Sequence, residues 1–221
     1  MSGKLIVIEG LDGSGKATQA QRLFDSLKSR NKDVIQVSFP DYESDSSALV
    51  KMYLKGEFGT DPNAVNPYAA SSFYAVDRYA SYIRNWRQFY IKGGIVIADR
   101  YTTSNAIHQC AKLPEEKWSE FLEWLFHYEY ELLGILSPDQ TIYLHVAPKV
   151  SQRLMTERYA GDESKKDIHE ANAGYLSKAY KAAAYCSSKL KWDIIECSNG
   201  DSMRIIDDIH EEVISTVHIE T

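Results

Sequence analysis

Residues 10–16 read Gly-Leu-Asp-Gly-Ser-Gly-Lys, and this stretch decides the fold. The residues before it, 5–9, form a short apolar run typical of a buried β-strand, and a helical pattern begins at Lys16. A strand, a glycine-rich turn, a lysine and a helix follow one another in a phosphate-binding P-loop. Glycines let backbone N–H groups curl around phosphate oxygens, and the helix N-terminus and the lysine add positive charge. The sequence therefore predicts a nucleotide site here, and the flanking strand and helix disfavour a chance glycine turn.

The expected phosphate site covers the loop and the first residues of the helix after it. Ala17 departs from the usual pattern, because a Ser or Thr at this position commonly offers a hydroxyl to Mg²⁺. Thr18 stands one position too late to replace that hydroxyl simply. We expect the nucleotide to be bound by Gly10, Asp12, Gly13, Ser14, Gly15, Lys16, Ala17 and Thr18.

The bulk properties are those of an ordinary globular chain. It has 221 residues, of which 44% are hydrophobic and 25% charged, and we interpret it as one α/β domain over residues 1–221. The net charge is −6, whereas nucleic-acid-binding proteins are normally basic, so we expect no nucleic-acid partner. No apolar run approaches a bilayer span or a leader, so we expect no membrane partner. Three cysteines without metal-ligand spacing fit a reducing cytoplasm.

Alternating strands and helices predict a doubly wound α/β fold with a parallel sheet. Val- and Ile-rich runs with little alternation are typical of strands buried on both faces. They occur at residues 5–9, 34–39, 95–99, 141–146 and 193–197. Helical patterns occur at residues 16–29, 48–54, 67–92, 115–132, 149–157, 170–191 and 203–217. Ligands bind such sheets at the carboxyl ends of the strands, so the residues after each strand are candidates for the site.

Two further strand ends carry candidate residues. Phe39-Pro40 and Tyr42 follow the second strand, where an ordinary strand-ending turn is an equally good interpretation. Asp99 and Arg100 end the third strand. A carboxylate beside a P-loop suits Mg²⁺, directly or through water, and a guanidinium suits a phosphate. A purely structural Asp–Arg pair is the alternative.

Two predicted helices are rich in aromatic residues. The helix over residues 67–92 carries Tyr74 and Arg78 four residues apart, and therefore on one face. An aromatic ring can stack on a nucleobase and a guanidinium can bond its carbonyl groups. Such a pair on a helix more commonly lies on a solvated face. The helix over residues 115–132 has aromatic residues on more than one face, so a subunit interface and plain core packing are both open.

A charged segment after the fourth strand has the composition of a mobile lid. It covers approximately residues 153–170, with Gly161 as its candidate hinge. A solvated loop between two helices is the alternative. Phosphoryl transfer needs cations over the migrating group, and this segment supplies Arg153, Arg158, Lys165 and Lys166.

The order of these motifs along nearly the whole chain resembles the thymidylate kinase family of P-loop nucleoside-monophosphate kinases. The motifs are the acidic P-loop at residues 9–16, Phe39-Pro40, Tyr74 with Arg78, Asp99-Arg100-Tyr101 and the charged lid. The resemblance implies a three-layer P-loop NTPase fold with a five-stranded parallel sheet, and a homodimer. It implies transfer of the γ-phosphoryl group of ATP to dTMP with Mg²⁺, which gives dTDP and ADP on the route to dTTP.

The resemblance also implies roles for individual residues. Asp12 corresponds to a contact with the acceptor sugar, Tyr74 to the ring that stacks on thymine, and Arg78 to its partner at the base edge. Arg100 and Tyr42 correspond to contacts with the acceptor phosphate. The other implied substrate contacts are Phe39, Pro40, Ser104, Asn105 and His108. The implied catalytic residues are Lys16, Asp99, Arg100, Arg158, Lys165 and Lys166, and Arg153 joins the ATP site.

Several positions differ from patterns found in the family. Gly13 follows the P-loop acid where one form of the family has a basic residue, so this chain is similar to the form that takes its catalytic cation from the lid. Tyr42 stands where some members have Arg. His108 stands where many have a Tyr near the sugar, which leaves the preference for deoxyribose over ribose open. Ala17 is a tolerated variation, because the family does not always keep a hydroxyl there.

The implied mechanism is an in-line transfer that needs no strong base, because the attacking phosphate is already an anion. Lys16 and the loop amides neutralise the donor phosphates, Asp99 helps to hold Mg²⁺, and Arg100 places the acceptor phosphate. A kinase of another pyrimidine nucleotide or of a deoxynucleoside is the nearest alternative. A catalytically weak nucleotide-binding protein, suggested by Ala17, is another. A GTPase is disfavoured, because no NKxD-type sequence follows a late strand.

Overall fold

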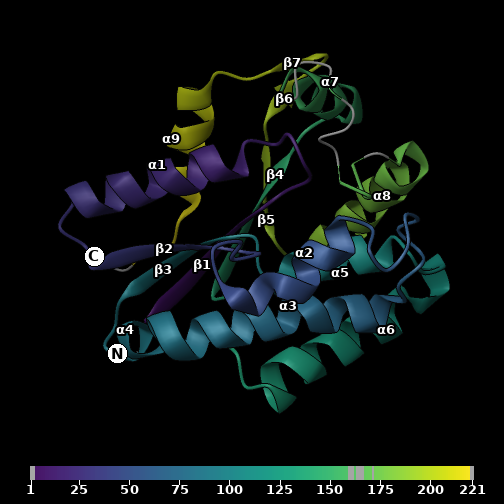
Figure 1. Cartoon of the computed structure of the whole chain (residues 1–221). Helices are drawn as coiled ribbons and strands as arrows, with labels where there is room; N and C mark the ends of the chain where they lie inside the picture. Colours follow the sequence, from purple (N-terminus) through teal and green to yellow (C-terminus); the bar gives the residue numbers. More distant parts are fainter. Residues whose placement is uncertain (1–2, 159–161, 163–166, 171, 220–221) are drawn as a thin grey trace.

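A computed structural model describes residues 3–158, 162, 167–170 and 172–219 of the chain. Its centre is a parallel sheet of five strands, in the order β2-β3-β1-β4-β5 (Figure 1). The strands are β1 (Lys4–Glu9), β2 (Val34–Ser38), β3 (Ile95–Asp99), β4 (Gln140–His145) and β5 (Asp193–Glu196). Each lies within one residue, at either end, of its predicted range. The predicted parallel sheet is therefore confirmed.

The central strand contributes to two hydrophobic layers, because its successive side chains point to opposite faces. Ile6 and Ile8 pack in one cluster with residues of α1 and α9, such as Leu23 and Val213. Leu5 and Val7 belong to a second cluster on the other face. Both pairs are completely buried, which explains why the strand is apolar without alternation. Figure 1 shows α1 and α9 on one side of the sheet and α3 and α6 on the other.

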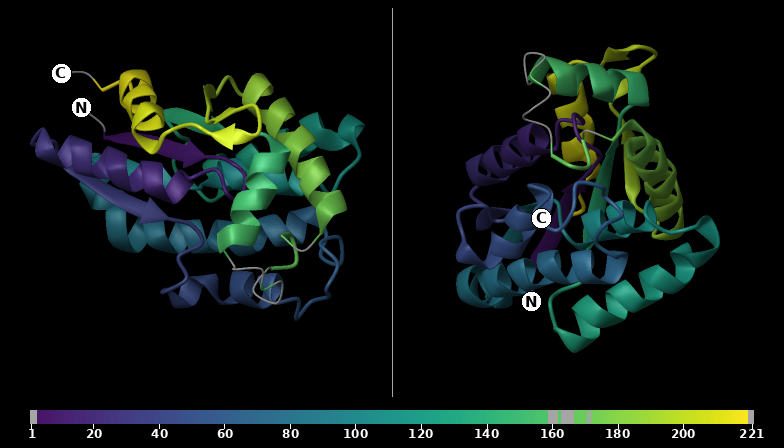
Figure 2. Two further views of the ribbon diagram at one scale, coloured as in Figure 1. Left: turned by 90° about the horizontal axis from the view of Figure 1, so that it is seen from above. Right: turned by 45° about the vertical axis from the view of Figure 1, so that its right-hand side comes forward.

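The helices fill the connections between the strands, as predicted. The first and last, α1 and α9, lie beside one another (Figure 2). The α-helices are α1 (Lys16–Ser29), α2 (Ala48–Leu54), α3 (Pro67–Ser81), α4 (Arg87–Ile91), α5 (Thr102–Cys110), α6 (Trp118–Phe126), α7 (Pro148–Arg158), α8 (Ala173–Lys189) and α9 (Ile206–Thr216). Short 3-10 turns η1 (Asp45–Ser47) and η3 (Glu115–Lys117) precede α2 and α6. The π-helical turn η2 (Tyr82–Trp86) joins α3 to α4, and η4 (His127–Leu132) continues α6.

Helix α5 was not predicted from the sequence. Its residues include Thr, Ser, Asn and His, which favour helix only weakly, and it lacks a single apolar stripe. Seven of its nine residues are nevertheless buried, because it packs against α3, α6 and α8. Burial on several sides replaces amphipathic periodicity, so tertiary packing rather than local preference forms this helix.

The chain after β5 forms a small antiparallel hairpin where a helix was expected to begin. Strands β6 (Ser198–Asn199) and β7 (Ser202–Met203) pair across Gly200 and Asp201. Gly200 has a φ of 59°, which a tight two-residue hairpin turn requires. The predicted helix over residues 203–217 therefore starts only at Ile206.

The predicted aromatic helix over residues 115–132, which contains α6, packs into the core. Trp118, Phe121 and Leu125 are at least 95% buried in the cluster that α5, α6 and α8 share. Trp124 stacks on Tyr128 with ring centroids 5.2 Å apart. Most of its aromatic content is thus used within the chain, which was one of the two interpretations left open.

Candidate active site

A cavity of about 1410 Å³ lies at the carboxyl ends of the strands. Its walls come from the P-loop, the ends of β2 and β3, helices α2, α3 and α5, and the segment 167–170. Most of the predicted site residues line this one cavity: Asp12, Gly13, Ser14, Gly15, Lys16, Ala17, Thr18, Phe39, Pro40, Tyr42, Tyr74, Arg78, Asp99, Arg100, Ser104, Asn105 and His108. The carboxyl edge is the place where open α/β sheets bind ligands.

The loop between β1 and α1 has the close-packed form of a P-loop. Gly13 and Gly15 have φ angles of 79° and 84°, a region that residues with a Cβ rarely adopt. A Cβ on Gly10 would lie 2.5 Å from Ser14 Oγ and 2.9 Å from the Leu144 carbonyl oxygen, so only glycine fits there. Gly10 does not line the cavity, and its role is to let the loop pack against β4.

Lys16 begins α1 and points back over the loop. Its Nζ donates to the Leu11 carbonyl oxygen at 2.9 Å and lies 3.9 Å from Asp12 Oδ1. Burial, together with the nearby positive charge of Arg100, lowers the pKa of the Lys16 ammonium to about 8. A buried ammonium with few anionic contacts gains stability when a phosphate arrives.

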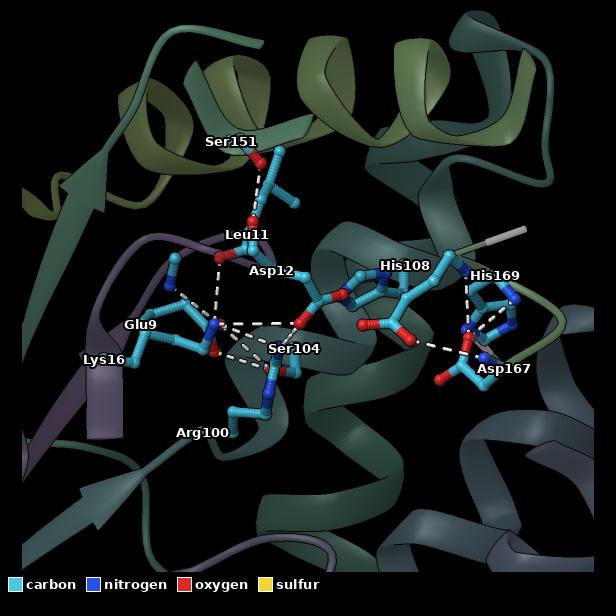
Figure 3. A network of polar contacts seen from close by, with 12 residues as sticks. Glu9, Leu11, Asp12, Lys16, Arg100, Ser104, His108, Ser151, Asp167 and His169 are labelled. Carbon is cyan, nitrogen blue, oxygen red and sulfur yellow. Dashed lines mark hydrogen bonds and ion pairs between the residues drawn. The ribbon is translucent and has the colours of Figure 1, made fainter. Parts of the chain in front are cut away.

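Arg100 lies at the centre of the polar site (Figure 3). It follows β3 with a φ of 67°, a strained value for a residue other than glycine, and its backbone N–H donates to the Ile8 carbonyl oxygen at 3.2 Å. One end of its guanidinium is ion-paired with Asp12. Its Nη1 lies 3.7 Å from Glu9 Oε1 and 3.3 Å from Ser104 Oγ. Arg100 therefore connects the P-loop, β1 and α5.

Two acids of different kinds surround Arg100. Burial pushes the pKa of the Asp12 carboxyl upward, but the charges of Arg100 and Lys16 outweigh this and lower it below its usual range. Glu9 is fully buried and accepts hydrogen bonds from Thr103 Oγ1 at 2.6 Å and Ser104 Oγ at 2.8 Å. Glu9 was assigned no role from the sequence, although an acid at the end of an apolar strand was a visible signal.

The turn that carries Tyr42 is anchored to α3. Asp77 is 1% exposed, and it accepts hydrogen bonds from the Asp41 backbone N–H at 2.8 Å and from Ser46 Oγ at 2.5 Å. Phe39 is buried against Tyr101, while Tyr42 is 53% exposed at the cavity. The turn is thus a fixed wall with one projecting ring.

The second wall combines Tyr74, Arg78 and Asn105. The Tyr74 ring lines the cavity and meets the ring of Tyr53 edge-on, with centroids 6.4 Å apart. Arg78 is 2% exposed and forms a two-point ion pair with Glu129, which also binds Asn105. The solvated-surface interpretation of Arg78 is therefore wrong, because the guanidinium is buried and paired.

Two histidines stack where segment 167–170 meets α5. The rings of His108 and His169 lie 5.9 Å apart at 9°, and Tyr175 stacks on His169 at 4.6 Å. His169 Nε2 is 2.8 Å from Tyr53 Oη, and Asp167 Oδ1 accepts the His169 backbone N–H at 2.8 Å. Sequence reasoning placed this segment in the lid but did not identify His169 as a contact of the site.

The proposed lid cations divide into two groups. Arg153 lies on the exposed face of α7, 3.8 Å from Glu157, and does not line the cavity. Arg158 ends α7, and Lys165 and Lys166 fall outside the described residues. The lid boundaries and the choice of catalytic cation therefore stay predictions.

Asp99 is the best candidate for holding a metal ion. Its Oδ1 is buried and has no hydrogen-bond partner in the described part of the chain. It lies close enough to Lys16 to raise the pKa of that ammonium. No group of three or more His, Cys, Asp or Glu side chains among the described residues has metal-site spacing. One carboxylate fits Mg²⁺, which takes most of its ligands from phosphates and water.

The two stacked histidines, His108 and His169, predict a loss of stability in mild acid. Burial lowers the pKa of His108 to about 4, and it lowers the pKa of His169 well below 6.5. The unfolded chain then binds more protons than the folded chain below about pH 6.5, so folded stability falls as the pH drops from there towards 4. We expect the free energy of unfolding to fall by at least about 1 kcal/mol between pH 6.5 and 5.

Thermal melts followed by circular dichroism at several pH values measure this effect. His108→Gln keeps a polar group beside Tyr175 but has no charge to gain, so it is expected to make the melting temperature depend less on pH. His218→Gln, at an exposed histidine, is the control and is expected to leave the pH dependence of stability unchanged. If the melting temperatures of wild type and His108→Gln depend equally on pH, His108 does not contribute to the loss of stability in acid.

Comparisons with known proteins agree with this geometry. The sequence model of the thymidylate kinase family matches residues 8–200. A thymidylate kinase of Plasmodium falciparum is 28% identical over 218 residues, covering 97% of this chain and 90% of that protein. One from Mycobacterium tuberculosis is 30% identical over 171 residues, covering 76% and 78%.

The fold is also similar to that of a solved structure. The thymidylate kinase structure from Candida albicans matches with a TM-score of 0.72 at 21% identity, over 97% of this chain and 90% of that one. No helix among the described residues is long and apolar enough to cross a bilayer. From the match over residues 8–200, the chain belongs to the thymidylate kinase family.

Proposed function

We propose that this chain transfers the γ-phosphoryl group of ATP to dTMP, giving ADP and dTDP. One observation carries the proposal: a single cavity holds both a P-loop and an aromatic–arginine wall, with Arg100 between them. The P-loop suits the phosphates of the donor, and the wall of Tyr74 and Arg78 suits a pyrimidine. Arg100 lies where the two phosphate chains would meet.

The donor half depends on the P-loop and Lys16. Backbone N–H groups of residues 13–18 and the N-terminus of α1 surround the expected position of the β-phosphate. Burial lowers the pKa of Lys16 to about 8, and the negative charge of bound phosphates would raise it again and keep the ammonium charged. Asp99, whose Oδ1 has no hydrogen-bond partner among the described residues, would hold Mg²⁺ directly or through water, and bound Mg²⁺ neutralises charge on the phosphate oxygens.

The acceptor half depends on residues from the P-loop, the ends of β2 and β3, and helices α3 and α5. Asp12 contacts the sugar, and Arg100 and Tyr42 bind the acceptor phosphate. Tyr74 stacks on the base, while Arg78 and Asn105 bind its edge. Phe39, Pro40, Ser104 and His108 complete the proposed site, as cavity-lining residues.

Chemistry in this site is positioning and charge stabilisation. The attacking oxygen belongs to a phosphate that is already an anion, so no residue needs to remove a proton. Arg100 is held by Asp12 and Glu9 before substrate arrives, which reduces the cost of ordering it in the transition state. Because Gly13 carries no charge, we propose that Arg158, Lys165 or Lys166 covers the migrating group from the lid.

An acceptor panel tests the proposed reaction. ADP release is measured at saturating ATP with five acceptors, which are dTMP, dUMP, dCMP, the thymine ribonucleoside monophosphate, and thymidine. We expect dTMP to give the highest kcat/KM, because the proposed site contacts both its base and its phosphate. A higher kcat/KM for another acceptor identifies a different kinase, and ATP binding without any turnover identifies a nucleotide-binding protein.

We also propose a homodimer and a cytoplasmic location. Val76, Tyr79 and Ile83 are 41–42% exposed and lie on one face of α3 and η2, an apolar stripe of the kind used between subunits. The three cysteines are free and buried, as in a reducing compartment.

Light scattering after gel filtration tests the dimer. Wild type is expected at twice the 25.1 kDa mass of the chain. Tyr79→Glu is expected to shift it to monomer, because a charge in an apolar interface is costly. Leu49→Glu, at an exposed position on α2, is the control that stays dimeric. A monomeric wild type contradicts this proposal.

A further inference from the structure

Glu129 is a completely buried acid that does not line the cavity. It lies in η4, behind the wall that Arg78 and Asn105 form. Its Oε1 accepts from Arg78 Nη2 at 2.5 Å and from Asn105 Nδ2 at 3.0 Å. Its Oε2 accepts from Arg78 Nε at 2.8 Å and from Thr102 Oγ1 at 2.7 Å. Four donors thus converge on one carboxylate.

This arrangement fixes which way the Asn105 amide faces. Its Nδ2 donates to Glu129 and also to the Ser71 carbonyl oxygen at 3.2 Å, so both amide hydrogens are used. A flipped amide would place its oxygen against two acceptors. The oxygen is therefore the amide group left for a ligand, and Asn105 acts as an acceptor at the cavity wall.

Glu129 fixes Arg78 in the same way. The Nε and Nη2 edge of the guanidinium faces the carboxylate, while Nη1 lies 3.5 Å from the Tyr101 carbonyl oxygen. A guanidinium has five N–H groups, so some remain for a ligand at the cavity wall. The wall therefore offers one fixed acceptor, from Asn105, and fixed donors, from Arg78.

A 4-oxo pyrimidine complements this wall, because it carries an N3–H donor and an O4 acceptor. A 4-amino pyrimidine reverses both groups. We propose that Glu129 is a positioning residue which sets the hydrogen-bond polarity of Arg78 and Asn105, and so makes the site selective for 4-oxo over 4-amino pyrimidines. This inference rests on the proposed function, since it assumes that the base lies against this wall.

Glu129→Gln tests the inference. The new amide N–H₂ replaces one acceptor by a donor, so either Arg78 loses a partner or Asn105 turns its own N–H₂ towards the cavity. The measurement is the ratio of dissociation constants of dCMP and dTMP, from competition binding, together with kcat/KM for dTMP. We expect the preference for dTMP to fall about tenfold or more, the effect of one lost hydrogen bond, with the KM for ATP unchanged.

Two variants separate positioning from simple loss of structure. Thr102→Val removes one donor to Oε2 but leaves Asn105 bound to Oε1, so it is expected to keep the preference for dTMP. Glu131→Gln lies two residues along η4 at a 70% exposed acid, and is expected to behave as wild type. If Glu129→Gln does not fold, Glu129→Asp tests positioning alone: it keeps the charge but draws the carboxylate back from Arg78 and Asn105, so the preference for dTMP over dCMP is again expected to fall.

The outcomes distinguish this inference from the function on which it rests. A wild type that does not phosphorylate dTMP overturns the proposed function. If the wild type phosphorylates dTMP but a Glu129 variant weakens the binding of dTMP and dCMP equally, only the proposed role of Glu129 is overturned. A selective loss of the preference for dTMP, with ATP binding intact, supports it.

Discussion

The ion pair between Arg100 and Asp12 is the contact on which the site depends. It joins residues 88 positions apart in the sequence, one in the P-loop and one after β3. The sheet makes the contact possible, because Ile8 of β1 pairs with Asp99 of β3. The residues that follow the two strands therefore emerge side by side at the carboxyl edge. An Arg100 without its acids would be a partly buried charge, which is strongly unfavourable.

Buried acids hold the cationic and amide groups that face the cavity. Glu9 binds the α5 hydroxyls beside Arg100, Asp77 holds the turn that carries Tyr42, and Glu129 holds Arg78 and Asn105. None of these three acids lines the cavity itself. Glu9 and Glu129 each satisfy one side of a polar group that lines the cavity, so its other side is available to a ligand in a set orientation, whereas Asp77 fixes the backbone of a turn. This is preorganisation, which lowers the cost of binding and catalysis.

Much of this site was predictable because strand ends are marked in the sequence. The P-loop at residues 10–16 and the Asp99-Arg100 pair follow apolar runs, and topology alone brings them together. Helix α5 was not predictable, because its residues are weak helix formers that packing alone stabilises. Glu129 was also missed, because its partners Arg78, Thr102 and Asn105 lie 24 to 51 positions away and no local pattern reports such a contact.

The position of His169 shows a similar limit. Composition marked residues 153–170 as a polar lid, but the stacking of His169 on His108 and Tyr175 depends on how that segment meets α5 and α8. Charge and glycine content identify a segment that moves or is solvated, and they do not identify which of its residues pack. The part of the lid that carries the proposed cations stays a prediction from sequence.

The central claim is that one cavity holds donor and acceptor together, with their phosphates meeting at Arg100. The most direct test is calorimetric binding of a dinucleotide in which adenosine and thymidine are joined through five phosphates. We predict one molecule bound per chain, competition with both ATP and dTMP, and an affinity at least about a hundredfold higher than that of either nucleotide alone, because the second half binds intramolecularly. Competition with only one of the two nucleotides, at an affinity no higher than that nucleotide's own, would contradict the claim.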